Sequence, residues 1–200
     1  MNENHRQLCP SPEWAAYLHS DVRPWLASHV DLGGEMLEIG PGPGASTEWL
    51  RHRVKRLVAL EVDEDAVESL AGRFVGTNVE VVIGDATATA FPGCSFDAVG
   101  AFTMLHHVPT LALQQAIVAE VGRVLRPGGA FIGSDSLASY GLHEFHEGDD
   151  YNPIDPAVLL VMLRSLGFEE IVLRVGESLL FTAHKAFPTP STDREREEPR

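Results

Sequence analysis

Cysteine is scarce in this chain, and so are long apolar runs. The 200 residues include two cysteines, Cys9 and Cys94, which are too few for a disulfide framework or a structural zinc site. No apolar run approaches the roughly 20 residues that a membrane-spanning helix needs, and residues 1–10 lack the apolar stretch of a signal peptide. We therefore expect a reduced, cytoplasmic protein that does not enter a membrane.

Basic residues are in the minority. Lysine and arginine together number 15 against 29 aspartates and glutamates, which gives a net charge of −14. Affinity for nucleic acid that does not depend on sequence comes mainly from lysine and arginine, so DNA, RNA and anionic lipid are disfavoured as partners. A small-molecule substrate is favoured, and a protein substrate stays open. The oligomeric state is not readable from this sequence.

What the chain does contain is an alternation of apolar strand-like segments and amphipathic helical segments. Strands are predicted at residues 36–39, 57–62, 79–83, 96–102 and 130–134, and helices at residues 45–53, 64–73, 110–125 and 155–166. This alternation is typical of one α/β domain with a doubly wound, mostly parallel sheet. Two β runs at residues 168–175 and 178–184 flank Gly176-Glu177, which predicts a tight hairpin.

A glycine-rich loop follows the first predicted strand. Residues 38–44 read Glu-Ile-Gly-Pro-Gly-Pro-Gly, and the alternate glycines let the backbone turn sharply and a ligand approach it. The N–H groups at the start of the next helix favour an anion. However, Pro41 and Pro43 remove two donors, and no Gly-Lys-Ser/Thr ending follows, so the loop is not a nucleotide P-loop. The dinucleotide pattern Gly-x-Gly-x-x-Gly also fits poorly, because the third glycine comes one residue early.

Two acidic residues end the next two predicted strands. Glu61 follows the glycine loop by about 20 residues, where a Rossmann-type unit places the carboxylate that binds ribose hydroxyls. Asp85 ends the third strand, where it can accept a hydrogen bond from the exocyclic amine of adenine. Because the carboxyl ends of parallel strands share one edge, we expect both acids beside the glycine loop.

The glycine loop, Glu61 and Asp85, in this order, resemble the class I S-adenosylmethionine-dependent methyltransferases. Residues 95–108 look like the fourth strand of that family with its following loop, and residues 121–129 look like the turn before its fifth strand. The resemblance covers roughly residues 30–185. It implies a Rossmann-like sheet of seven strands in the order 3-2-1-4-5-7-6, with the last strand antiparallel, helices on both faces and an extra N-terminal helix.

The resemblance also implies a cofactor and a reaction. The cofactor is S-adenosyl-L-methionine, which leaves as S-adenosyl-L-homocysteine, and the methyl group goes to an O, N or C nucleophile of a small molecule. Glu38 is expected to orient the methionine ammonium. The full set of predicted cofactor-binding residues is Glu38, Gly40, Pro41, Gly42, Gly44, Glu61, Val62, Asp85, Ala86 and Thr103.

His106 and His107 directly follow the fourth predicted strand, where acceptors usually approach in the resembled family. They are candidate catalytic bases, since a nucleophile that carries a proton must lose it. The alternative is a pair that packs under the rim of the sheet. A second region, residues 142–151, is rich in histidine and acid, but Gly148 and Asn152-Pro153 indicate a loop. We predict that this loop shapes the substrate site and that it holds no metal.

The N-terminal helical candidate at residues 12–30 is either a helix packed on the sheet edge or a lid over the cofactor. Pro24 kinks it or divides it in two. We predict three segments: a lid at 1–30, the cofactor-binding domain at 31–186 and a disordered tail at 187–200. From the lid and the 136–154 region, the predicted substrate-binding residues are Trp14, Tyr17, His19, Tyr140, His143, His146 and Tyr151.

Two other functions remain as alternatives. One is a regulatory module that binds S-adenosylmethionine without catalysis. The other is an NAD-dependent oxidoreductase, which is disfavoured by the glycine spacing and by the missing Tyr-x-x-x-Lys pattern.

Overall fold

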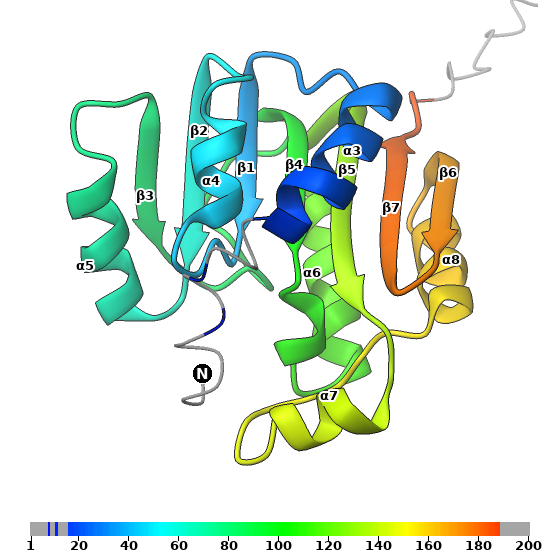
Figure 1. Ribbon diagram of the computed structural model, residues 1–200. Coiled ribbons are helices and arrows are strands. Elements are labelled where there is room, and N and C mark those ends of the chain that lie inside the picture. The colour runs from blue at the N-terminus through cyan, green and yellow to red at the C-terminus, as the bar shows by residue number, and fades with distance from the viewer. Residues whose placement is uncertain (1–7, 9–10, 12–15, 189–200) are drawn as a thin grey trace, which may run out of the picture.

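The chain folds around a seven-stranded sheet with the strand order β3-β2-β1-β4-β5-β7-β6. The computed structural model describes residues 8, 11 and 16–188. Figure 1 shows α3 and α4 in front of the sheet and α6 and α8 behind it. The predicted fold class, strand order and layers are therefore confirmed.

Most elements lie close to their predicted bounds. The strands are β1 Glu35–Ile39, β2 Arg56–Glu61, β3 Val79–Ile83, β4 Phe96–Phe102, β5 Leu125–Ser136, β6 Phe168–Val175 and β7 Ser178–Lys185. The helices after β1 are α4 Ala45–Leu50, α5 Glu64–Arg73, α6 Leu111–Val124, α7 Tyr140–Phe145 and α8 Pro156–Ser165, with a 3-10 turn η2 at Leu105–His107. In the order β3, β2, β1, β4, β5 along the sheet, neighbouring strands pair in parallel. Strand β7 pairs antiparallel with both β5 and β6.

Helix starts follow the expected capping chemistry. Asp63 accepts a hydrogen bond from the Ala66 N–H at the start of α5, and Thr110 caps α6 through the Leu113 N–H. Asp155 accepts from two N–H groups of α8, and Pro156 occupies the first turn. These caps satisfy donors that a helix start otherwise leaves without partners.

Two predictions about helices were wrong. The helix predicted at 45–53 ends at Leu50, because residues 51–53 turn back and the Arg53 N–H bonds the Leu50 carbonyl. The region predicted as a loop contains helix α7, which Ser139 caps by accepting from the Leu142 N–H. Helix α7 is only six residues long, so its apolar pattern is too short to be distinguished from a loop in the sequence.

The N-terminal helical segment packs on the sheet. It consists of a π-helical turn η1 at Leu18–Val22 and helix α3 at Arg23–His29, and Pro24 lies in the first turn of α3. Leu18, Val22 and Leu26 are buried in one cluster with residues of β1, β4 and β5. The predicted division near Pro24 agrees with this arrangement, but the segment packs on the face of the sheet over its central strands and not on the sheet edge. Trp14 and the predicted tail from residue 189 onward lie outside the described residues.

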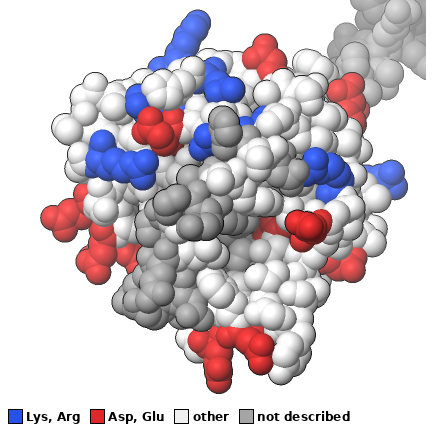
Figure 2. All heavy atoms as spheres, viewed as in Figure 1, with Lys and Arg blue, Asp and Glu red and all other residues white. Residues whose placement is uncertain are grey.

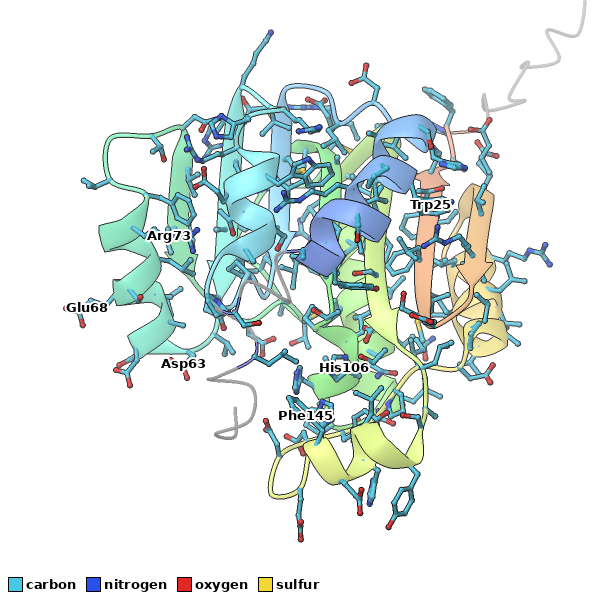
Figure 3. The ribbon with its side chains drawn as sticks, viewed as in Figure 1. Trp25, Asp63, Glu68, Arg73, His106 and Phe145 are labelled. Atoms are coloured by element: carbon cyan, nitrogen blue, oxygen red, sulfur yellow. The ribbon has the colours of Figure 1, made fainter. Side chains whose placement is uncertain are left out.

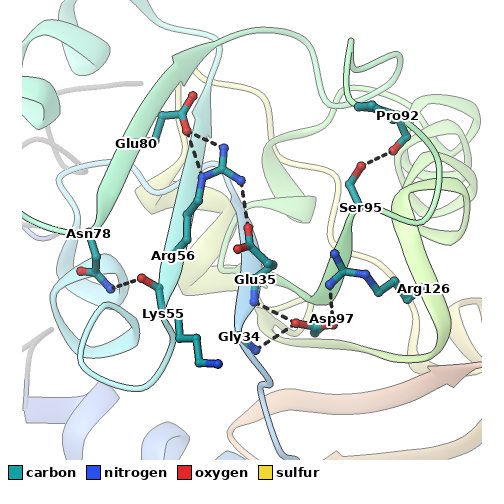
Figure 4. A network of polar contacts seen from close by, with 10 residues as sticks. All are labelled: Gly34, Glu35, Lys55, Arg56, Asn78, Glu80, Pro92, Ser95, Asp97 and Arg126. Carbon is teal, nitrogen blue, oxygen red and sulfur yellow. Dashed lines mark hydrogen bonds and ion pairs between the residues drawn. The ribbon is translucent and has the colours of Figure 1, made fainter.

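A network of charged side chains lies at the amino ends of the parallel strands (Figure 4). Arg56 of β2 bonds Glu35 of β1 at 2.9 Å and Glu80 of β3 at 2.5 Å. The Asp97 carboxylate of β4 accepts from the Gly34 and Glu35 N–H groups at 2.9 Å and from Arg126 at 2.5 Å. Salt-bridging side chains thus connect the strand starts.

Among the described residues, no helix combines the length and the apolar character that crossing a bilayer requires.

Candidate functional site

A cleft of about 480 Å³ lies at the carboxyl ends of β1, β2, β3 and β4. Ligands of open α/β sheets bind at this edge, where the strand order reverses. Eight predicted cofactor-binding residues line the cleft: Gly40, Pro41, Gly42, Glu61, Val62, Asp85, Ala86 and Thr103. Figure 2 shows one face of the molecule, in the view of Figure 1. Lysine and arginine gather on its upper half, and the charged side chains on its lower part are acidic.

The glycines of the loop have different roles. Gly42 has φ +52°, and a Cβ atom built there would meet nothing within 4 Å, because this backbone faces the open cleft. Gly44 has φ +82°, and a Cβ there would come within 2.8 Å of Leu70 and 2.9 Å of Phe74. Gly44 does not line the cleft. Gly44 instead packs the loop closely on α5, and its contact with the cofactor stays a prediction.

Glu61 connects the glycine loop to the end of β2. Its carboxylate accepts from the Gly42 N–H at 3.2 Å, the Val62 N–H at 2.8 Å and the Asp63 N–H at 3.2 Å. The residue is 8% exposed and lines the cleft. Three backbone donors hold the carboxylate in place, and two carboxylate oxygens retain capacity for further hydrogen bonds.

Asp85 and Thr103 line the same cleft as Glu61. Asp85 accepts from the Thr87 N–H at 2.8 Å, which caps the turn after β3, and it also lines the cleft. Thr103 has φ +51°, an unfavourable value for a residue with a branched side chain. Its N–H bonds the Ser134 carbonyl at 2.7 Å, so pairing with β5 holds the strained residue at the site.

Glu38 lies beneath the cleft and does not line it. The side chain is fully buried and accepts hydrogen bonds from the Ser46 hydroxyl and, at 2.6 Å, from the Thr47 hydroxyl. Burial raises the pKa of Glu38 to about 7, although these two hydrogen bonds act in the opposite direction. Ser46 does line the cleft, so Glu38 reaches the cleft through the start of α4.

The two predicted catalytic histidines have different surroundings. His107 lines the cleft. His106 is buried, and its Nδ1 lies 2.5 Å from Oδ1 of Asp135, a fully buried residue of β5. The two imidazole rings are 4.1 Å apart, centre to centre. Figure 3 shows His106 at the lower end of the sheet, close to α7 and Phe145.

Helix α7 brings a third histidine to this pair. His146, at the end of α7, is 3% exposed, and its Nδ1 lies 2.5 Å from the Leu142 carbonyl oxygen. Its ring centre is 5.0 Å from that of His106 and 5.3 Å from that of His107. Burial lowers the pKa of His146, although the Leu142 hydrogen bond opposes this. Tyr151 stacks on the His146 ring at 4.2 Å.

None of the predicted substrate-binding residues whose side chains the structure describes lines the cleft, His146 and Tyr151 included. Tyr140 is 78% exposed, His143 is exposed, and neither lines the cleft. The Tyr17 hydroxyl bonds the Ser178 hydroxyl at 2.6 Å, away from the lining. His19 belongs to η1, but its side chain lies outside the description. The physical reason is orientation: the predicted loop is a short helix whose exposed face carries Tyr140 and His143.

Sequence reasoning missed several residues of the site. Asp135 was not predicted, although a buried acid near the end of the fifth strand follows the same rule that identified Glu61. The cleft is also lined by Leu18, Pro109, Leu113 and Ile117, which belong to no recognisable motif, whereas Met104 and Val108 follow the fourth strand and Asp149 and Asp150 belong to the loop predicted to shape the substrate site.

The comparisons with known proteins agree with this geometry. Residues 37–133 match the family model described as a methyltransferase domain. The chain is 29% identical over 148 residues to a fatty-acid O-methyltransferase of Mycolicibacterium smegmatis, covering 72% of this chain and 52% of that protein. It is 32% identical over 127 residues to a probable ribosomal RNA small subunit methyltransferase A of Pyrobaculum aerophilum, covering 58% of this chain and 55% of that protein.

A solved structure has the same fold. The PH0226 protein of Pyrococcus horikoshii superposes with a TM-score of 0.76 at 20% identity, covering 94% of this chain and all of that one. The chain spans about half the length of the two curated relatives named above. The names of those relatives differ in their methyl acceptors, so the acceptor must be argued from the site itself.

Proposed function

Because the chain carries a class I S-adenosylmethionine-dependent methyltransferase domain, we propose that it transfers a methyl group from S-adenosylmethionine to an O, N or C atom of a small molecule. One observation carries the proposal. The Glu61 carboxylate ends β2, bonds the Gly42 N–H of the glycine loop and lines the same cleft as that glycine. This is where a Rossmann-type unit binds a ribose.

The residues of the cleft fit the parts of the cofactor. Glu61 would accept hydrogen bonds from the ribose hydroxyls and Asp85 from the adenine amine, with Val62 and Ala86 beside the adenine ring. Gly42 leaves space for the ligand because it has no side chain. Gly40, Pro41 and Thr103 line the remaining wall, and Glu38 would act on the methionine ammonium through Ser46.

The bound cofactor supplies a methyl group on a positively charged sulfur, which is already a good leaving group. The work left to this chain is mainly to hold the two reactants in line, a contribution of about 7–11 kcal/mol in well-oriented systems. The hydrogen-bonded frame around Glu61 and the strained Thr103 backbone support such positioning, because neither depends on mobile side chains.

The remaining wall of the cleft supports a small acceptor with an apolar body. Met104, Val108 and Leu113 are among the apolar residues that line it, and Asp149 and Asp150 lie at the same cleft. Two carboxylates and a net charge of −14 oppose the approach of a phosphate backbone. We therefore place a neutral or cationic small molecule here, in preference to ribosomal RNA.

His106 and His107 remain our proposed catalytic residues. His107 would contact the acceptor, since it lines the cleft, and His106 would support it from behind while bonded to Asp135. We also propose that the N-terminal segment covers the cleft, because Leu18 of η1 is part of the lining. We also propose that the protein acts in the cytoplasm, because its two cysteines are too few for a disulfide framework.

Calorimetric titration tests the cofactor first. We expect saturable binding of S-adenosylmethionine and S-adenosylhomocysteine at one site, and no binding of NADH. Binding of NADH alone would reject the methyltransferase in favour of the oxidoreductase.

An acceptor screen by mass spectrometry follows, with fatty acids, alcohols, amines and ribosomal RNA as substrates. A mass gain of one methyl group on a small molecule is the expected result. Methylation of RNA alone would overturn the acceptor class, and tight cofactor binding without transfer to any acceptor would favour the regulatory module.

A further inference from the structure

Three histidines from two separate parts of the chain meet beside the cleft, and one of them, His107, lines it. His106 and His107 belong to η2, and His146 ends α7, some 40 residues later. One nitrogen of each ring can be chosen so that all three lie within 4.8 Å of one another. His106 and His146 are buried, and His107 is half-buried and faces the cleft. Buried histidines are not expected to gather in this way for packing alone, because each ring carries polar nitrogens that must be satisfied.

The hydrogen bonds of two rings fix which nitrogen carries the lone pair. Nδ1 of His106 is bonded to the Asp135 carboxylate, and Nδ1 of His146 is bonded to the Leu142 carbonyl. Each Nδ1 donates in these bonds, so in the neutral ring Nε2 is the nitrogen that carries the lone pair. Metal-binding histidines show this arrangement, in which a carboxylate or a carbonyl holds the far side of the ring.

Asp135 adds an independent sign. It is fully buried, and its second oxygen, Oδ2, has no hydrogen-bond partner within the described part of the chain. Its Oδ1 contacts His106 and the Ser136 N–H. A buried carboxylate without a nearby lysine or arginine is costly, and a divalent cation beside His106 would compensate its charge.

We propose that His106, His107 and His146 bind one divalent transition-metal ion, with Asp135 orienting His106 behind it. Three neutral imidazoles suit zinc or a similar borderline-soft ion better than magnesium or calcium, which prefer oxygen ligands. Zinc–nitrogen bonds of about 2.0–2.1 Å place tetrahedral ligands roughly 3.4 Å apart. The three nitrogens lie within 4.8 Å of one another, so they need to approach by at most about 1.4 Å, a movement within the reach of side-chain rotation.

An ion here would leave its fourth position toward the cleft, because His107 is on the cleft wall. Such an open position is typical of catalytic rather than structural zinc sites. The site would then take an acceptor oxygen, so the histidines would act on the acceptor through the ion and not as bases. This last step rests on the proposed function, whereas the metal site itself does not.

Cobalt(II) titration of the untagged, metal-free chain of 200 residues tests the site directly. We expect one equivalent to bind, with the intense visible absorption of a four-coordinate ion, and zinc to displace it. His146→Asn should weaken cobalt binding at least tenfold. His143→Asn is the matched control, since His143 is an exposed histidine one turn earlier in α7, and it should leave the titration unchanged.

Asp135→Asn sharpens the test. Loss of a carboxylate that orients a ligand lowers metal affinity by about 10–100-fold, whereas a carboxylate that merely packs would not change it. If thermal melting shows that His146→Asn is unfolded, His107→Asn replaces it, because His107 is half-buried.

Two results would overturn the metal site: no cobalt binding at one equivalent, or equal loss in the His143→Asn and His146→Asn variants. Calorimetry with S-adenosylmethionine on the same preparation separates the two proposals. Cofactor binding without cobalt binding would reject the ion alone, and cobalt binding without cofactor binding would reject the methyltransferase alone.

Discussion

The amino ends and the carboxyl ends of the parallel strands both carry carboxylates, and the two edges satisfy them by different means. At the amino ends, Glu35, Glu80 and Asp97 are paired with arginine. At the carboxyl ends, Glu38, Glu61, Asp85 and Asp135 accept from backbone N–H groups, hydroxyls or a histidine, and none of them contacts a lysine or arginine of the described chain.

This difference separates a structural edge from a ligand-binding edge. A carboxylate already neutralised by arginine has little left to offer a ligand. Glu61 and Asp85, which accept only from backbone N–H groups, can still accept hydrogen bonds from an incoming group. The cleft lies at the second edge and not at the first, so changes at the two edges should affect different measurements.

The largest effect is expected from Glu61→Ala at the cleft. Loss of two hydrogen bonds to a charged acceptor, at about 1.5–3 kcal/mol each, should weaken S-adenosylmethionine binding by at least about a hundredfold. Isothermal calorimetry measures this. Glu61→Gln keeps a neutral acceptor, so its affinity for S-adenosylmethionine should lie between the affinities of the parent chain and of Glu61→Ala. An affinity within threefold of the parent would show that the ribose lies elsewhere and would remove the contrast between the edges.

Glu38 should make stability depend on pH. Its folded pKa is raised from 4.5 to about 7, so the folded chain holds a proton that the unfolded chain has lost between these values. The stabilising contribution is complete below about pH 4.5 and disappears as the pH rises through about 7, with an amplitude of about 3 kcal/mol.

Urea unfolding at several pH values from 4 to 8 detects this change. Glu38→Gln cannot ionise, so the difference in unfolding free energy between the two proteins should shift in favour of the glutamine variant as the pH rises. A difference that stays constant over this range would mean that folding does not shift the pKa of Glu38.

A smaller effect, and on stability alone, is expected from Asp97→Ala at the amino edge. The substitution leaves the Gly34 and Glu35 N–H groups and Arg126 without their acceptor, which should cost about 2 kcal/mol of unfolding free energy. Asp97→Asn retains an acceptor and should cost less. Cofactor affinity should not change in either variant, and a clear loss of affinity would contradict the division between the two edges.

The smallest effect belongs to Arg56→Met. Arg56 and both of its partners are substantially exposed, and exposed pairs contribute about 0.2–1 kcal/mol each. The loss should shrink further in 1 M salt, where charges are screened over about 3 Å. Chemical unfolding at low and high salt measures it. A loss that is unaffected by salt would point to packing of the arginine stem.

The sequence predicted the fold and most residues of the cleft beside the glycine loop, because both depend on local signals. A strand that ends in an acid is visible in the chain, so Glu61 and Asp85 were identified correctly as residues of one edge. The strand order came from the family resemblance, and the hairpin from the spacing around Gly176-Glu177. Gly44 shows the limit of such signals, since only the structure reveals that it packs against Leu70 and Phe74.

The acceptor half of the site was harder to predict, because it is assembled by tertiary contacts. Asp135, His106 and His146 come from β5, η2 and the end of α7, and no spacing in the sequence brings them together. Tyr140 and His143 were expected in the site because of their residue types. Their placement on the exposed side of α7 depends on how that helix docks, which its six residues do not encode as a pattern.

The insertion of β7 between β5 and β6 has a consequence for the order in which a growing chain folds. One edge of β5 pairs with β4, which comes earlier in the chain. The other edge pairs with β7 and is completed only when residues 178–185 have been synthesised, as the pairs Ala130 with His184 and Asp135 with Leu179 show. Until then, one edge of β5 lacks its hydrogen-bonded neighbour and is a point where nascent chains can associate wrongly. Asp135 stands on that strand, so the glycine loop can form early while the histidine side of the cleft must wait for the last hairpin.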